Sequence, residues 1–116
     1  MLVVDDEQAL AEFVREALEG FVDVETAQNT SEADVQLGMQ KFDLVLADHL
    51  MPGETGLDFL MRCNTHFPRM KRLLMTGYLN PDLISRAQTL ANLSGYLIKP
   101  VNIAQLRTAV LGALAH

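Results

Sequence analysis

The chain has 116 residues, and at this length one hydrophobic core can bury roughly two-thirds of the surface that the unfolded chain exposes, so we expect a single domain spanning residues 1–116. Hydrophobic residues make up 49% of the chain and charged residues 21%, but no apolar run approaches the roughly 18 residues of a membrane span, which argues against a membrane protein. The net charge of −6 argues against direct binding of nucleic acids or anionic membrane surfaces by this domain.

The start of the chain and its cysteine content indicate a cellular location. Residues 1–4 are apolar and lead directly into three acidic residues, with no basic segment and too short an apolar run for a secretory signal peptide. We therefore expect a cytoplasmic protein. Cys63 is the single cysteine, so an internal disulfide or a two-cysteine metal site cannot form, and a structural thiol is the favoured interpretation.

Short apolar runs alternate with amphipathic stretches five times, which is the pattern of a parallel sheet with crossover helices. The expected strands are residues 2–4, 22–24, 44–47, 73–75 and 96–98, and the second is the weakest of them. A first helix follows the first strand and stops before Gly20. Its apolar residues repeat at helical spacing: Leu10, Phe13, Val14, Ala17 and Leu18.

Three later helices have side chains that can cap their amino-terminal ends. Asn29 and Asn102 each have a glutamate or glutamine three residues further on, as in a capping box. Asn80 is followed by Pro81, and proline is favoured at the first position of a helix. We expect these residues to begin the second, fifth and fourth helices respectively.

The last helix is expected to run from Ile103 to about Ala115 with two rows of small or apolar side chains. The row expected to face the core is Ile103, Leu106, Val110 and Leu114. The second row is Ala104, Thr108, Leu111 and Ala115. A solvated helix face is expected to carry charges, but residues 108–115 carry none. We therefore expect the second row to pack against a second copy of the chain, giving a homodimer, or against the next domain of a longer parent chain.

Five βα units with right-handed crossovers form an open, doubly wound α/β sheet, whose ligands bind beyond the carboxyl ends of the strands. Polar residues stand at four of these strand ends: Asp5 and Asp6 after the first strand, Asp48 after the third, Thr76 after the fourth and Lys99 after the fifth. Because the strands are parallel, their ends lie at one edge of the sheet. The sequence therefore predicts one shared functional site.

The residue types at these strand ends suit phosphoryl transfer. Three crowded carboxylates repel one another unless a hard divalent cation neutralises them, and Mg²⁺, or Mn²⁺ in its place, prefers such oxygen ligands. Asp48 can act as a carboxylate nucleophile that forms an aspartyl phosphate. Lys99 and the Thr76 hydroxyl can meet the charge on the phosphoryl oxygens, while Gly77 leaves room for that group and a free backbone N–H.

Several segments together resemble the receiver domains of two-component response regulators. They are residues 2–7, residues 43–48 with 51–53 and 56–57, residues 75–77, and residues 96–100. Their order and spacing match over nearly the whole chain. The resemblance implies a flavodoxin-like receiver fold with five parallel strands in the order 2-1-3-4-5. It also implies a signalling domain that catalyses its own phosphorylation and dephosphorylation, not an enzyme acting on a separate substrate.

The resemblance implies roles for individual residues. Asp48 would accept a phosphoryl group from a sensor histidine kinase or a phosphotransfer protein. Asp6 would bind the metal directly and Asp5 through water, with Asp48 and the backbone carbonyl of Leu50 as further ligands.

The resemblance further implies a switch. Lys99, Thr76 and Gly77 would bind the phosphoryl group, and Thr76 with Tyr96 would form the switch pair. An output domain or partner protein would read the surface of the fourth helix, the fifth strand and the fifth helix. The bond between Lys99 and Pro100 would be cis.

Some positions depart from the commonest pattern of these receivers. His49 and Leu50 follow the expected acceptor, Glu54 and Thr55 replace the usual acidic residue before the next glycine, and Tyr78 lies two positions after the switch threonine. Leu50 and Tyr78 would flank the path by which water reaches a phosphorylated Asp48. We therefore expect slow dephosphorylation.

Two other classes of protein would share some of these residues. A hydrolase of the haloacid dehalogenase type also uses an aspartate nucleophile and Mg²⁺, but its nucleophile lies on the first strand in a DxD arrangement, whereas Asp5 and Asp6 have no spacer. A degenerate receiver would bind partners without being phosphorylated, yet every catalytic position is filled here. Zinc is not expected, because the three histidines, His49, His66 and His116, lack metal-ligand spacing.

Overall fold

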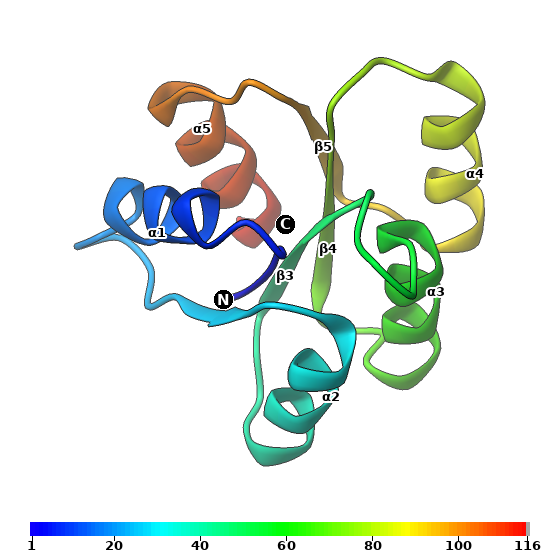
Figure 1. Ribbon diagram of the computed structural model, residues 1–116, viewed down its shortest axis with the longest axis horizontal. Helices are drawn as coiled ribbons and strands as arrows, with labels where there is room; N and C mark the ends of the chain where they lie inside the picture. The colour runs from blue at the N-terminus through cyan, green and yellow to red at the C-terminus, as the bar shows by residue number, and fades with distance from the viewer. Residues whose placement is uncertain (116) are drawn as a thin grey trace.

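The structure is a computed structural model that describes residues 1–115, in which five strands alternate with five helices (Figure 1). The strands are β1 (Leu2–Val4), β2 (Glu25–Ala27), β3 (Leu44–Asp48), β4 (Lys71–Thr76) and β5 (Gly95–Ile98). The helices are α1 (Gln8–Ala17), α2 (Thr30–Met39), α3 (Gly56–His66), α4 (Pro81–Leu90) and α5 (Ile103–Leu114).

The strands form one parallel sheet in the order β2-β1-β3-β4-β5, which confirms the fold class and the strand order predicted from the sequence. The chain builds outward in one direction from β1 to β2 and in the other from β3 to β5, so the strand order reverses between β1 and β3. All carboxyl ends of the strands meet at one edge, which we call the carboxyl edge. The opposite edge is the amino edge.

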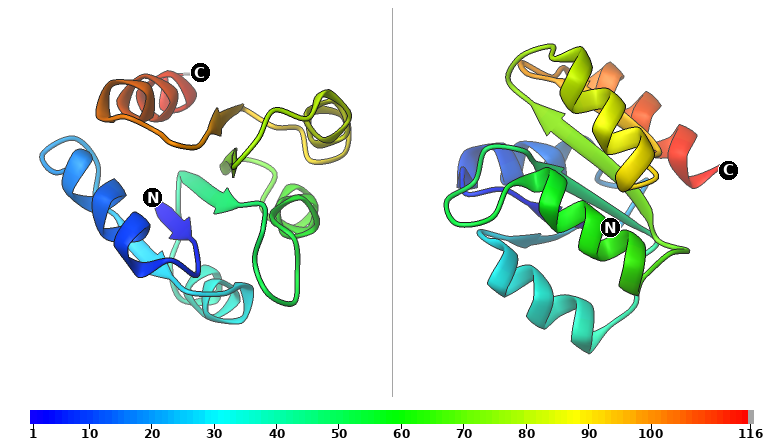
Figure 2. Two further views of the ribbon diagram at one scale, coloured as in Figure 1. Left: turned by 45° about the horizontal axis from the view of Figure 1, so that its top comes forward. Right: turned by 90° about the vertical axis from the view of Figure 1, so that its right-hand side faces the viewer.

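Helices cover both faces of the sheet (Figure 2). α1 and α5 pack on one face, and α2, α3 and α4 pack on the other. Alternate side chains of β3 enter opposite layers: Leu44 and Leu46 face α1 and α5, whereas Val45 and Ala47 face the other three helices. All of β3 is buried, and a strand covered on both faces needs the uninterrupted apolar run seen in its sequence.

The three predicted helix caps are confirmed. The side-chain oxygen of Asn29 accepts a hydrogen bond from the backbone N–H of Glu32 at 2.8 Å. Asn80 caps α4 in the same way, with Pro81 at its first position. Asn102 and Gln105 form a reciprocal capping box at the start of α5. Each cap satisfies backbone donors that have no partner inside the helix.

The second strand lies three residues later than the sequence predicted. We expected residues 22–24, but β2 is Glu25–Ala27. Val22 and Val24 are partly buried against the layer that contains α1 and α5, so packing rather than strand pairing explains their apolar character. The pairing with β1 begins where the N–H of Glu25 donates to the carbonyl of Met1 at 2.9 Å.

The inward row of α5 also differs from the prediction. Ile103 and Leu114 are 45% and 37% exposed, although both were expected to face the core. The buried residues of α5 are Leu106, Val110 and Ala113, because position 113 continues the helical i, i+4, i+7 row better than position 114. The second row, Ala104, Thr108, Leu111 and Ala115, is exposed in the domain, and its packing against a partner stays a prediction.

Two further sequence-based expectations concern the membrane and the thiol. Among the described residues, every helix is too short or too polar to span a bilayer. Cys63 is buried in α3, and burial raises the pKa of its thiol to about 12. This thiol therefore packs as part of the core.

Candidate functional site

The polar residues predicted at the strand ends meet at the carboxyl edge. Backbone pairing continues one residue beyond the strands and aligns these polar residues at the edge. The N–H of Asp5 donates to the carbonyl of Ala27 at 3.0 Å. The N–H of Lys99 donates to the carbonyl of Thr76 at 2.8 Å, so the fourth and fifth strand ends are held side by side.

Three aspartates form an acidic cluster at this edge. Asp5, Asp6 and Asp48 each offer one carboxylate oxygen, and these oxygens lie within 4.8 Å of one another. Asp5 and Asp48 are 1% and 4% exposed, whereas Asp6 is open to solvent. The cluster thus joins two buried carboxylates to one that solvent can reach.

Lys99 supplies the positive charge nearest to this cluster. Its Nζ atom lies 3.2 Å from an oxygen of Asp48, 3.8 Å from Asp5 and 3.7 Å from Glu7. The Asp48 contact is the shortest of the three. One ammonium group therefore faces three carboxylates, and the site keeps an excess of negative charge.

Burial and neighbouring charges change the pKa values of these groups. Burial raises the pKa of Asp5 to about 6, although a hydrogen bond from the backbone of Glu7 opposes the change. Burial also raises the pKa of Asp48, against the effect of Lys99. Burial alone would lower the pKa of Lys99, but Asp48 and Asp5 raise it on balance. The raised pKa values of Asp5 and Asp48 mark carboxylates held out of water at a cost in free energy, whereas the raised pKa of Lys99 shows that these carboxylates favour its charged form.

The carboxylates fit a hard divalent cation. All of the donors are oxygen atoms, which suits such an ion. The Oδ2 atom of Asp5 is buried and accepts no hydrogen bond from any residue of the described range 1–115. A buried polar atom of this kind is costly unless something binds it. The cluster could therefore hold a metal ion.

The loop after Asp48 is held close to the acceptor backbone. The N–H of His49 donates to the carbonyl of Met75 at 2.8 Å, and the backbone of Leu50 acts to lower the pKa of the Asp48 carboxylate against the effect of burial. The N–H of Gly56 donates to the carbonyl of His49 at 2.9 Å. A Cβ atom at Gly56 would overlap the carbonyl of Asp48 and lie 2.8 Å from the Cα of His49. A glycine is therefore required where α3 begins.

The remaining predicted residues lie around this centre. Thr76 is fully buried, and its hydroxyl donates to the carbonyl of Tyr78 at 3.4 Å. A Cβ at Gly77 would meet no atom within 4 Å, so Gly77 borders open space at the end of β4. Tyr96 is 40% exposed and points away from the core, while Leu50 and Tyr78 are 59% and 50% exposed. The peptide bond between Lys99 and Pro100 is cis, as the resemblance implied.

Two charged residues that contact the site or the loop beside it were not predicted from the sequence. Glu7 contacts Lys99, but its place after two expected metal ligands made it look like an ordinary solvated residue. Arg62 binds Glu54 of the loop after β3 across eight positions, and no helical or strand spacing indicates such a pair. Of the three histidines, His49 is partly buried after β3, His66 ends α3, and His116 lies outside the described residues.

Known proteins share this arrangement of sequence and fold. The family model of the response regulator receiver domain matches residues 1–111. The hydrogenase transcriptional regulatory protein HoxA of Cupriavidus necator is 32% identical over 100 residues, covering 86% of this chain and 21% of HoxA. Sporulation initiation phosphotransferase F of Bacillus subtilis is 29% identical over 112 residues, covering 95% of this chain and 89% of that protein.

A solved structure gives the same result. The signal receiver domain of an HD domain-containing protein from Pseudomonas fluorescens matches with a TM-score of 0.93 at 27% identity, covering 99% of this chain and 93% of that one. The chain spans only about a fifth to a quarter of the length of the transcriptional regulators that it matches. The family model nevertheless covers nearly all of its 116 residues. This chain therefore belongs to the receiver domain family of two-component response regulators.

Proposed function

We propose that residues 1–116 form one receiver domain that accepts a phosphoryl group on Asp48. The observation that carries this proposal is the 3.2 Å contact between the Lys99 ammonium and the buried Asp48 carboxylate inside the acidic cluster. A carboxylate oxygen of Asp48 attacks the phosphorus atom of the donor. The bond from phosphorus to the donor atom breaks, and its electron pair leaves with the donor.

Residues at the neighbouring strand ends stabilise the transferred group. Lys99 already contacts Asp48, so its charge favours the ionised nucleophile and meets the phosphoryl oxygens as they arrive. The Thr76 hydroxyl and the N–H of the exposed Gly77 donate from the end of β4. In this way the domain catalyses its own phosphorylation and dephosphorylation.

The proposed metal ligands are Asp5, Asp6, Asp48 and the backbone carbonyl of Leu50. When bound there, Mg²⁺ or Mn²⁺ supplies positive charge that offsets the carboxylates and the phosphoryl oxygens. Solvent-exposed Asp6 is the proposed direct ligand, and Asp5 acts through a water molecule. The Oδ2 atom of Asp5 supports this role, because its contact with Lys99 is 3.8 Å long and it accepts no hydrogen bond from the described residues.

The proposed donor is a sensor histidine kinase or a phosphotransfer protein. One relative is described as a phosphotransferase and another as a transcriptional regulatory protein. Both descriptions fit a domain that takes a phosphoryl group and passes the information on. The output would come from another domain of a longer chain or from a separate partner protein.

The proposed output surface is formed by α4, β5 and α5, and Thr76 with Tyr96 switches it. Tyr96 is exposed in this structure. Its side chain is therefore free to turn inward once Thr76 moves toward the phosphoryl group. Apolar Leu90 and Leu111 are 45% and 41% exposed on this surface, and a groove runs between Tyr96 and Thr108.

A substitution on α5 tests this surface, including its use in a homodimer or in docking of an output domain. Leu111→Glu should abolish phosphorylation-dependent association in light scattering without unfolding the domain. The control is Val35→Glu, because Val35 is 62% exposed on α2, on the other side of the sheet. Equal association of wild type and Leu111→Glu would contradict the assignment.

Treatment with acetyl phosphate distinguishes the proposed function from its alternatives. Intact mass after incubation with Mg²⁺ should show a gain of one phosphoryl group, and chelation of the metal should prevent it. A hydrolase would instead turn over the donor without keeping the group, and a degenerate receiver would remain unchanged. Either of these two results would reject phosphoacceptor function.

A further inference from the structure

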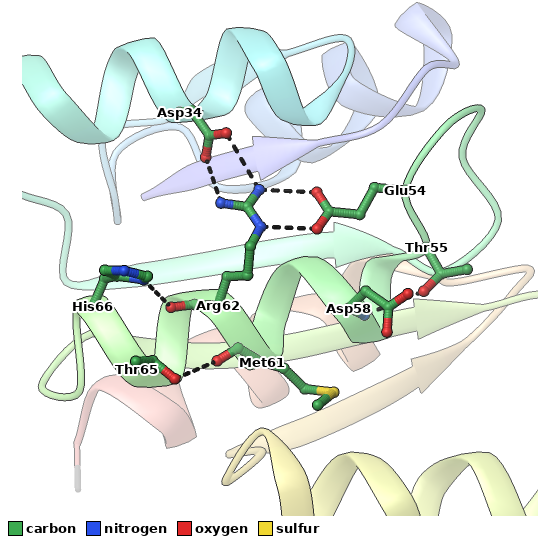
Figure 3. A network of polar contacts seen from close by, with 8 residues as sticks. All are labelled: Asp34, Glu54, Thr55, Asp58, Met61, Arg62, Thr65 and His66. Carbon is green, nitrogen blue, oxygen red and sulfur yellow. Dashed lines mark hydrogen bonds and ion pairs between the residues drawn. The ribbon is translucent and has the colours of Figure 1, made fainter.

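An arginine on α3 ties the loop after β3 to two helices (Figure 3). The Arg62 guanidinium donates two hydrogen bonds to the Glu54 carboxylate, at 2.8 and 2.9 Å. It donates two more to Asp34 of α2, both at 3.3 Å. We call these three residues the Arg62 clamp. It joins α2, α3 and the loop of residues 49–55.

The geometry of the clamp is more specific than that of an ordinary surface ion pair. The contact of Arg15 with Glu12 is a single 3.3 Å contact between neighbouring turns of α1. The planar guanidinium of Arg62 instead donates paired hydrogen bonds to two carboxylates, and its central carbon lies 5.4 Å from the ring centre of Phe59. Paired hydrogen bonds of this kind fix orientation as well as distance. The Glu54 side chain is only 25% exposed, which indicates that the clamp holds it in one place.

The clamped loop contains a proposed metal ligand. Its first residue is tied to the sheet, because the N–H of His49 donates to the carbonyl of Met75 at 2.8 Å, and the backbone of Leu50 acts to lower the pKa of the nearby Asp48 carboxylate. Its base is closed by the hydrogen bond between Gly56 and His49. Glu54 lies between these points and the helix, and its carboxylate binds Arg62 eight positions later. The clamp therefore restrains the part of the loop that the base contact leaves free.

We propose that Arg62 is a positioning residue that holds the loop after β3 so that the Leu50 backbone stays against Asp48. This inference rests on the proposed function, because the Leu50 carbonyl matters there as a metal ligand. The Glu54 arm carries the effect, since its contacts are shorter and less exposed than those of Asp34. The Asp34 arm orients the guanidinium from the other side.

Hydrogen exchange of the metal-free protein tests the clamp directly. Arg62→Met should raise the exchange of the amides in residues 50–55 about tenfold by local opening, while amides of β3 and β4 stay protected. Glu54→Ala should act alike, and Asp34→Asn should have a smaller effect. Arg62→Lys, which keeps the charge but loses the fork, should restore only part of the protection. Arg15→Met is the matched control and should leave the loop unchanged.

Calorimetric titration with Mg²⁺ supplies the second measurement. Arg62→Met and Glu54→Ala should weaken binding about threefold to tenfold, less than the loss typical when a direct partner of a ligand is removed. Loop exchange and Mg²⁺ affinity within twofold of wild type in both variants would overturn the clamp. If wild type itself binds no Mg²⁺, the proposed metal site fails, and this inference fails with it.

Discussion

Both edges of the sheet bury charged side chains, but the two edges differ in how many hydrogen bonds these side chains make. At the amino edge, Arg72 of β4 is 2% exposed, and its guanidinium donates to the backbone carbonyls of Phe67, Met70, Ala91 and Asn92. At the carboxyl edge, Asp5 and Asp48 are equally buried but share a single lysine, and an oxygen of Asp5 has no hydrogen bond within the described residues.

The difference distinguishes a charged residue that stabilises the fold from charged residues that would serve the proposed phosphoryl transfer. Arg72 fastens the carboxyl-terminal ends of α3 and α4, since the four carbonyls it binds lie in the turns that follow these helices. The buried aspartates have fewer such partners: the N–H of Glu7 donates to one oxygen of Asp5, and the other accepts no hydrogen bond from the described residues. Burial raises the pKa values of both Asp5 and Asp48. Functional sites commonly keep destabilising groups of this kind, and the rest of the fold offsets them.

The largest expected effect is at the amino edge. Arg72→Met should destabilise the protein by about 3 kcal/mol or more, because two buried and two partly buried hydrogen bonds to backbone carbonyls would be lost. Chemical denaturation measures this loss, and the solvent-exposed Arg69→Met should change stability by less than about 0.5 kcal/mol. A loss below about 1 kcal/mol for Arg72→Met would show that water replaces the guanidinium without penalty.

A substitution at the carboxyl edge should act in the opposite direction. Asp5→Asn should stabilise the metal-free protein at neutral pH by about 2 kcal/mol, because it removes a buried charge whose pKa is raised to about 6. The sign follows from the folded pKa, which lies above the ordinary value of 3.8. The folded state binds more protons between these values, so wild type loses stability as the pH rises from about 4 to about 6.

Denaturation at a series of pH values, with chelator present, checks this prediction. The stability of Asp5→Asn should fall less than that of wild type over the same range. A variant that is less stable than wild type at neutral pH would contradict the comparison of the two edges. It would mean that the Lys99 contact outweighs the cost of burying Asp5.

A smaller effect is expected from the apolar side chains beside the carboxyl edge. Leu50 and Tyr78 are large and exposed, and neither offers a charged side chain that could guide water to a phosphoryl group on Asp48. Replacing them together by Asn and Glu should speed loss of the phosphoryl group by about tenfold, less than the roughly hundredfold or more that a positioned acid or base typically contributes. Time courses of dephosphorylation measure this rate. An unchanged rate of dephosphorylation would contradict the prediction that Leu50 and Tyr78 make this step slow.

Much of this architecture could be predicted because its signals are local. The buried run of β3 and the caps at Asn29, Asn80 and Asn102 are fixed by nearby residues, and parallel pairing then brings the strand ends together. The position of β2 was wrong because Val22 and Val24 are apolar for packing, whereas the paired residues include the polar pair Glu25 and Thr26.

Contacts between distant side chains could not be predicted in the same way. Arg62 reaches Asp34 across 28 positions, and Arg72 binds carbonyls, which carry no side-chain signal at all. In α5, Ile103 and Leu114 look like core residues by type, but the phase of the helix exposes both. Such features depend on how the helices pack after the sheet has formed.

Phosphorylation of matched variants at the two ends of β3 tests the central claim most directly. Asp48 ends the strand at the carboxyl edge, whereas Asp43 immediately precedes it at the amino edge and is exposed. With acetyl phosphate and Mg²⁺, wild type and Asp43→Asn should each gain one phosphoryl group in intact mass spectrometry, and Asp48→Asn should gain none. Undiminished labelling of a folded Asp48→Asn variant would contradict the assignment of Asp48 as the phosphoacceptor.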